Sequence, residues 1–167
     1  KEKIKTLNKK QIAKFLYEIG LKYKKYGEIK EALSYINESK KIVEKNSSNE
    51  NIIKIEFILS RLYRDIGNFK ICEKYLKECE KYYKKNRNSS IYKEIIEDFC
   101  VLYQHLSNFD KALEYCDKLY TLAKETNDKE YELVSYQQYT FIYSKLNDSI
   151  KKEEYLLYDL VIGNPPY

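Results

Sequence analysis

The cysteines and the single histidine are the first side chains to consider for chemistry, because thiolates and imidazole bind zinc and act as nucleophiles or bases. The chain has four cysteines, Cys72, Cys79, Cys100 and Cys116, and one histidine, His105. No two cysteines form a Cys-x-x-Cys pair, whereas a zinc site needs about four Cys or His ligands at short paired spacings. The sequence therefore predicts no metal site.

The same cysteines occupy positions where small apolar side chains are expected. A free cysteine packs as a small hydrophobe, and we expect a structural role for all four. A redox pair between Cys100 and Cys116 is the alternative, although no basic setting that would activate a thiol is evident. His105 has no neighbouring nucleophile pattern, so we expect it on the surface or in packing.

The sequence also predicts no site for acid–base catalysis or for phosphate binding. The carboxylates lie beside lysines at helix-surface spacings, as in Glu73-Lys74, and no isolated pair is poised for proton transfer. The glycines, Gly20, Gly27, Gly67 and Gly163, form no glycine-rich phosphate loop. We expect no catalytic residues, no cofactor and no enzymatic activity.

Composition is typical of a globular helical protein. Of 167 residues, 34% are charged and 43% hydrophobic, and both prolines stand at Pro165 and Pro166, where they interrupt no earlier helix. The net charge of +5 is spread out and gives no nucleic-acid footprint. No membrane-length apolar run or signal peptide is visible, so we expect a cytoplasmic protein without membrane contact. Because the chain has no Met, we expect it to be a piece of a longer product.

An internal repeat organises the chain. The period is 40 residues, and it is marked by two series of tyrosines with a turn position between them. The series are Tyr23, Tyr63, Tyr103 and Tyr143; Tyr35, Tyr75, Tyr115 and Tyr155; and the turn residues Gly27, Gly67, Ser107 and Asn147. At the next position Asn68, Asn108 and Asp148 suit a helix N-cap.

Each repeat predicts two helices. Apolar spacing of three and four residues, as in Ile55, Ile58, Leu59 and Leu62, supports this. The first helices are expected at 10–26, 50–66, 90–106 and 130–146, and the second at 29–45, 69–85, 109–125 and 149–159. Polar linkers at 46–51, 86–90 and 126–128 separate the repeats.

The repeat resembles the tetratricopeptide repeat (TPR). Ile19-Gly20-x-x-Tyr23 followed by Gly27-Glu-Ile-x-x-Ala32 matches that pattern, as does Phe99-Cys100-x-x-Tyr103 followed by Ser107-Asn-Phe-x-x-Ala112. The resemblance implies an all-α, right-handed α-solenoid of about four helix hairpins over residues 1–159. We expect small residues such as Gly20 and Ala32 to let paired helices approach closely, and the tyrosines to fill gaps between neighbouring units.

In the TPR family the first helices line a concave face where peptides lie. Carried over by repeat position, the resemblance implies a groove that is basic in its first half, acidic in its second and centred on Arg61 and Arg64. The predicted groove residues are Tyr17, Lys24, Lys54, Phe57, Arg61, Arg64, Glu97, Gln104, Gln137 and Phe141, with Lys14, Leu21, Glu94, Val101 and Val134 beside them. The alternative is that these are ordinary solvated helix residues.

The long, tyrosine-rich repeats also resemble the sensor domains of Rap/PlcR/NprR-type regulators, cytoplasmic proteins that bind imported signalling peptides. This resemblance implies a peptide-binding module of a quorum-sensing regulator. The partner would be a short peptide or protein segment in the groove, and nucleic acid would be bound only through a domain absent from this chain. A homodimer stays an open alternative.

The last residues follow a different pattern. Residues 158–167 read Tyr-Asp-Leu-Val-Ile-Gly-Asn-Pro-Pro-Tyr, which resembles motif IV of DNA N6-adenine methyltransferases. By that resemblance Asn164, Pro165 and Tyr167 would hold a flipped adenine. The other parts of such an enzyme are missing from the sequence. We therefore treat residues 160–167 as an extended tail, which folds over the last helix or enters a groove. The alternative is that the chain is an accessory TPR domain of a methyltransferase, truncated after this motif. The third explanation is that the resemblance is a coincidence.

Overall fold

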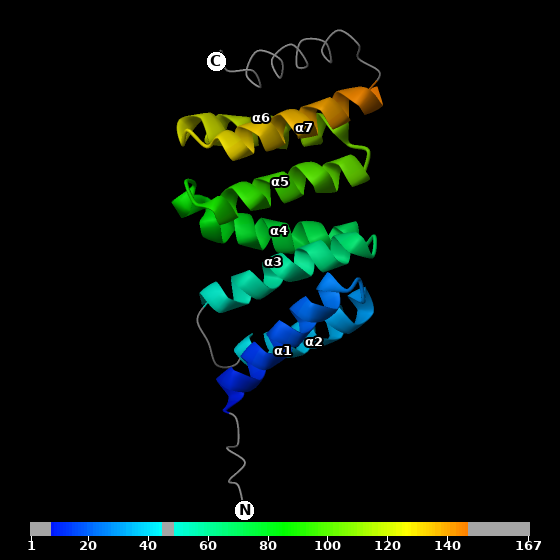
Figure 1. Cartoon of the computed structure of the whole chain (residues 1–167), viewed down its shortest axis with the longest axis vertical. Helices are drawn as coiled ribbons and strands as arrows, with labels where there is room; N and C mark the ends of the chain where they lie inside the picture. Colours follow the sequence, from blue (N-terminus) through cyan, green and yellow to red (C-terminus); the bar gives the residue numbers. More distant parts are fainter. Residues whose placement is uncertain (1–7, 45–48, 147–167) are drawn as a thin grey trace, which may run out of the picture. The chain divides into compact units, whose positions relative to one another are not determined.

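The computed structural model describes residues 8–44 and 49–146, and all regular elements among them are helical (Figure 1). The chain divides into two compact units, residues 1–82 and 83–167. In chain order the elements are α1 (Lys9–Lys25), α2 (Ile29–Glu44), α3 (Asn49–Asp65), α4 (Phe69–Tyr83), a 3-10 helix η1 (Lys84–Asn86), α5 (Ser90–His105), α6 (Phe109–Glu125) and α7 (Lys129–Leu146).

The predicted helices are confirmed to within a few residues wherever the structure describes them. The largest difference is that α4 ends at Tyr83, before the predicted end at 85, and gives way to η1. The predicted helix 149–159 and the tail 160–167 lie outside the described residues.

The repeated turn position adopts a left-handed backbone conformation. Gly27 and Gly67 have φ of 79° and 75°, and Ser107 has 53°. In each turn the next residue donates its N–H to a tyrosine carbonyl five residues earlier, at 3.0, 2.8 and 2.9 Å. This is the bond that closes a helix end around a left-handed residue, so the turns need glycine or a tolerated substitute. The expected N-caps Asn68 and Asn108 then accept backbone N–H groups of α4 and α6.

These turns give opposite predictions for two substitutions. Gly67→Ala should lower the free energy of unfolding by about 1 kcal/mol, because a side chain is strained at positive φ. Ser107→Gly should raise it by several tenths of a kcal/mol, because it removes the same strain at the equivalent turn. Urea denaturation followed by circular dichroism measures both free energies. Equal effects of the same sign would contradict the conclusion that these turns favour glycine because of their positive φ.

The recurring tyrosines stack in pairs, and each pair joins the two helices of one hairpin. These contacts within a hairpin were not expected, since the sequence predicted that the tyrosines fill gaps between neighbouring units. The reason is geometric: antiparallel helices place residues at similar distances from their connecting turn opposite one another. The pairs, with the distances between ring centroids, are Tyr23–Tyr35 at 5.3 Å, Tyr63–Tyr75 at 5.9 Å and Tyr103–Tyr115 at 5.5 Å. Tyr75 also meets the neighbouring hairpin, since Lys40 Nζ lies 4.7 Å from its ring centre.

The N-terminal unit has a continuous apolar core between α1, α2 and α3. Its buried members are Ala13, Ala32, Ile36, Val43, Ile55, Leu59 and Leu62. As predicted, Gly20 permits close approach of α1 and α2: a Cβ placed there would lie 2.6 Å from Ile36 side-chain carbons and 3.3 Å from the Ala32 carbonyl oxygen. Lys40 links α2 to α3 through an ion pair with Glu56 at 2.8 Å.

The C-terminal unit buries charged groups together with its apolar core. Lys93 on α5 is almost completely buried, and its Nζ lies 2.6 Å from Asp128 Oδ2 at the start of α7. Glu132 is also buried, and it is paired with Lys124 and Lys129, each at 3.0 Å. These pairs tie α7 to α5 and to α6, and they offset the cost of removing the charges from water.

Candidate functional site

The predicted groove residues of the N-terminal unit lie along one face of α1 and one face of α3. On α1 they are Tyr17 and Lys24, and on α3 they are Lys54, Phe57, Arg61 and Arg64, at spacings of three, four and seven residues. Such spacings keep side chains on one side of a helix. The two faces meet, because Tyr17 and Lys54 line a common pocket.

The two central arginines of α3 are held by their neighbours. The guanidinium of Arg61 lies 4.3 Å from the ring centre of Phe57, within the range of a cation–π interaction. Phe57 itself is only 8% exposed, so its ring supports Arg61 and does not offer the open apolar contact expected from the sequence. The Nε of Arg64 lies 3.9 Å from Asp65 Oδ1. Both arginines remain partly accessible at this face.

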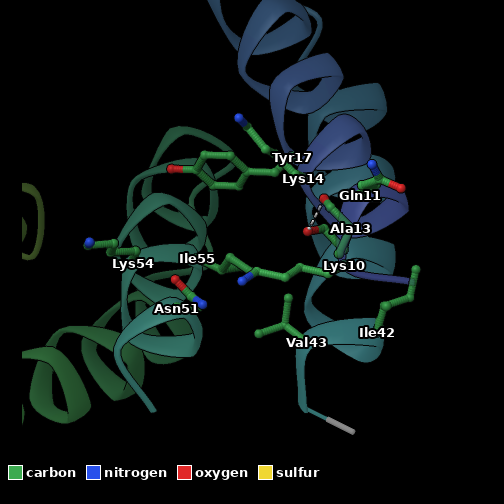
Figure 2. Close-up of a pocket in the computed structure, with 11 residues that line it drawn as sticks. Lys10, Gln11, Ala13, Lys14, Tyr17, Ile42, Val43, Asn51, Lys54 and Ile55 are labelled. Atoms are coloured by element: carbon green, nitrogen blue, oxygen red, sulfur yellow. Dashed lines mark hydrogen bonds between the residues drawn. The ribbon is translucent and has the colours of Figure 1, made fainter. Parts of the chain in front are cut away.

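A pocket of about 350 Å³ opens between α1, α2 and α3. Figure 2 shows Tyr17 reaching from α1 toward α3, with Ile55 contributed by α3 and Ile42 and Val43 by α2. The described lining is Lys10, Gln11, Ala13, Lys14, Tyr17, Ser39, Ile42, Val43, Asn51, Lys54 and Ile55. Aliphatic side chains therefore form the wall, and the charged residues of this described lining are all lysines.

The phenol of Tyr17 is polar but partly withdrawn from water. Burial raises its pKa, and the positive charge of Lys54 lowers it to a smaller extent. Tyr17 therefore stays a neutral hydroxyl at physiological pH, able to donate a hydrogen bond to an anion in the pocket.

In the C-terminal unit the structure brings only some of the predicted residues together. Gln104 on α5 donates to Gln138 Oε1 on α7 at 2.7 Å and to Cys100 Sγ at 3.3 Å. The adjacent Gln137, which the repeat register predicted, is instead exposed. Phe141 is 44% exposed, and Lys145 Nζ lies 5.5 Å from its ring centre.

Carboxylates lie near Tyr131 in the same unit, together with Lys93, whose Nζ lies 5.5 Å from the centre of its ring. The pKa of Tyr131 is raised to about 12, first by burial and then by the carboxylates of Glu94, Glu97 and other neighbours. A phenol with that pKa stays neutral at physiological pH.

All four cysteines are free and buried, as expected for packing residues. Burial is the main cause that raises the pKa of Cys116. The Cys100 thiol raises this pKa as well, because the two side chains are neighbours. A raised pKa suppresses the thiolate that redox and nucleophilic chemistry require, which argues against the redox alternative. Among the described residues no cluster of His, Cys, Asp and Glu is placed to hold a metal ion.

Sequence reasoning missed the α2 wall of the pocket and part of its rim. Ile42, Val43, Asn51 and Lys10 line it, but the groove register assigns only selected first-helix positions. One signal was available: Ile42-Val43 is an apolar pair near the end of a predicted helix, close to the polar linker at 46–51.

Comparisons with known proteins define the fold. No protein family and no curated protein matches the chain, whereas solved structures do. BtubC (BKLC) from P. vanneervenii has a TM-score of 0.79 and 14% identity, over 99% of this chain and 70% of that protein. A structure of nearly identical TPR-like repeats from a Podosopora anserina protein described as a kinesin light chain has a TM-score of 0.80 and 17% identity, over 95% and 78%.

A third similar structure is that of a bacterial phosphatase. Aspartyl phosphate phosphatase F from Bacillus subtilis has a TM-score of 0.79 and 14% identity, over 95% of this chain and 43% of that protein. At these identities the likeness concerns the fold. The chain thus has the all-α fold of TPR-like helical repeat proteins. Within the described ranges no helix is both long and apolar enough to cross a membrane.

Proposed function

We propose that this chain is a non-catalytic binding module whose α1/α3 face takes an acidic segment of a peptide or protein partner. The observation that carries the proposal is the row of cations Lys54, Arg61 and Arg64 along α3, with Lys24 at the equivalent repeat position of α1. Arginines recognise carboxylates through paired, charge-assisted hydrogen bonds. Packing of Phe57 beneath Arg61 fixes the guanidinium in advance, which lowers the entropy lost on binding.

The finer role is that of a sensor domain in a cytoplasmic regulator. Likeness in fold to aspartyl phosphate phosphatase F supports this role, together with the long repeats that resemble the Rap/PlcR/NprR type. A peptide signal is the ligand that such a role requires, and its acidic character follows from the cations of α1 and α3.

The test compares fluorescein-labelled hexaglutamate with hexalysine by fluorescence polarisation. We expect hexaglutamate to bind with an affinity that falls as salt rises, and hexalysine not to bind at this face. Arg61→Glu combined with Arg64→Glu should weaken hexaglutamate binding by about tenfold or more, which corresponds to about 1.4 kcal/mol.

A matched control keeps the net charge equal. Lys74→Glu combined with Lys81→Glu reverses two exposed lysines of α4 and should leave binding close to wild type. Equal losses in both double variants would mean that only the net charge matters, and the site would be wrong.

The second candidate is an accessory domain of a DNA N6-adenine methyltransferase, and the observation that favours it is the Asn164-Pro-Pro-Tyr167 sequence. The intact mass of the gene product from its host tests it. A product several hundred residues longer would support this candidate, and one that ends near Tyr167 would remove it.

A further inference from the structure

We propose that the pocket between α1, α2 and α3 binds a medium-chain aliphatic carboxylate. This small-molecule site shares Lys54 with the peptide-binding face but goes beyond it, because it depends on the pocket wall, Lys10 and Lys14 and not on Arg61 and Arg64. A bound alkyl chain would lie along the wall, with its carboxylate at the rim.

The wall suits an alkyl chain in shape and in chemistry. Ala13, Ile42, Val43 and Ile55 supply its apolar surface. A methylene group occupies about the volume of one water molecule in the liquid, about 30 Å³. The pocket, about 350 Å³ in volume and open at its rim, therefore has room for an alkyl chain of about ten carbons.

The wall offers little to a peptide backbone. Ser39 Oγ already donates to the Ala13 carbonyl oxygen at 2.8 Å. The two carboxamides of the described lining, those of Gln11 and Asn51, belong to exposed residues, and Gln11 Oε1 already accepts the Asn8 backbone N–H at 2.9 Å. At Ala13, Ser39 and Ile55, inside the three helices, the backbone groups are engaged in helical hydrogen bonds, whereas the other lining residues include members of terminal turns at the rim. A buried amide without a hydrogen-bond partner costs free energy, whereas an alkyl chain needs no partner.

The rim complements a carboxylate. Lys10, Lys14 and Lys54 line the opening, and the lining within the described residues includes no acidic side chain. Two of these lysines have acidic neighbours on their own helices, with Lys14 lying 3.8 Å from Glu18 and Lys54 lying 2.6 Å from Glu50. These are exposed pairs one helical turn apart, which contribute little and exchange readily. A bound carboxylate would also accept a hydrogen bond from the neutral Tyr17 hydroxyl.

The experiment is a titration of methyl-labelled protein with sodium decanoate, kept below its micelle-forming concentration and followed by NMR. We expect saturable shifts of the methyl signals of Ile42, Val43 and Ile55. Octanoate should bind about fifteenfold more weakly than decanoate, because each methylene contributes about fourfold in affinity. Decanol, which lacks the charge, should bind about tenfold more weakly.

Charge variants separate the carboxylate contact from burial of the chain. Lys10→Glu combined with Lys54→Glu should weaken decanoate by about tenfold and leave decanol unchanged. Lys30→Glu combined with Lys74→Glu changes the net charge by the same amount at positions outside the pocket lining. This variant should bind decanoate and decanol with unchanged affinity. The Arg61→Glu/Arg64→Glu variant should still bind decanoate, so failure of the peptide-binding proposal would leave this one standing.

Three results would overturn the proposal. The first is an absence of shifts at the three pocket residues. The second is equal binding of decanol and decanoate, with no effect of the rim variant. The third is occupation of the pocket by a leucine-ended tetrapeptide but not by decanoate, which would assign the site to a peptide side chain.

Discussion

Replacing Gly20 with leucine is expected to lower the free energy of unfolding by about 3 kcal/mol. Even a Cβ at this position would lie 2.6 Å from the Cγ1 and Cδ1 atoms of Ile36, which is completely buried, and 3.3 Å from the Ala32 carbonyl oxygen. Because protein interiors are close-packed, we expect that a leucine at this position forces α1 and α2 apart. Urea denaturation followed by circular dichroism measures the loss.

The cause can be checked through Ile36. Gly20→Ala should destabilise the protein less than Gly20→Leu does. Adding Ile36→Val to Gly20→Ala should recover part of the stability lost in Gly20→Ala, because it removes one of the two close carbons. A Gly20→Leu protein as stable as wild type would show that the helices do not approach closely at this point.

Replacing Asp128 with alanine is expected to destabilise the protein by about 3 kcal/mol. Asp128 is the partner of Lys93, whose side chain is only 4% exposed, and it also accepts the backbone N–H of Tyr131 at the start of α7. The substitution therefore leaves a buried ammonium group without its carboxylate and removes a helix N-cap. Thermal and urea unfolding measure the effect.

A double-mutant cycle and a pH series separate those two causes. Asp128→Asn keeps an N-cap but loses the charge, and adding Lys93→Met should restore much of the stability, because no buried charge then remains. The hydrogen bond from Lys93 lowers the pKa of Asp128, so the folded protein binds this proton less readily than the unfolded chain. This contribution to stability is present above the unfolded pKa of about 3.9 and is lost as pH falls through the folded pKa. An Asp128→Asn protein with the wild-type pH dependence below pH 4 would contradict this.

Spacing in the sequence sufficed to predict the helices. The turn at Gly27 and Gly67 needs a left-handed residue, the next position caps the following helix, and a 40-residue period repeats both signals. Gly20 was also predictable as a close-approach position, because the small residue recurs at a fixed distance before a tyrosine.

Contacts made by rings and charges could not be predicted in the same way. Periodicity places Tyr23 and Tyr35 on their helices, but the stacking of their rings depends on how two antiparallel helices meet at the turn. Nothing in the sequence pattern distinguishes Lys93 from the many other lysines, and only the approach of α7 to α5 buries it against Asp128. The pocket likewise depends on where α2 passes α1 and α3, and the register of the first helices contains no information on that.

The most direct test of the central proposal is amide chemical-shift mapping of the chain with unlabelled hexaglutamate. The proposed binding face predicts the largest shifts on α1 and α3, around Lys24, Lys54, Arg61 and Arg64, and their disappearance in the Arg61→Glu/Arg64→Glu variant. The largest shifts on α2, α4 or α6, or a complete absence of shifts, would contradict it.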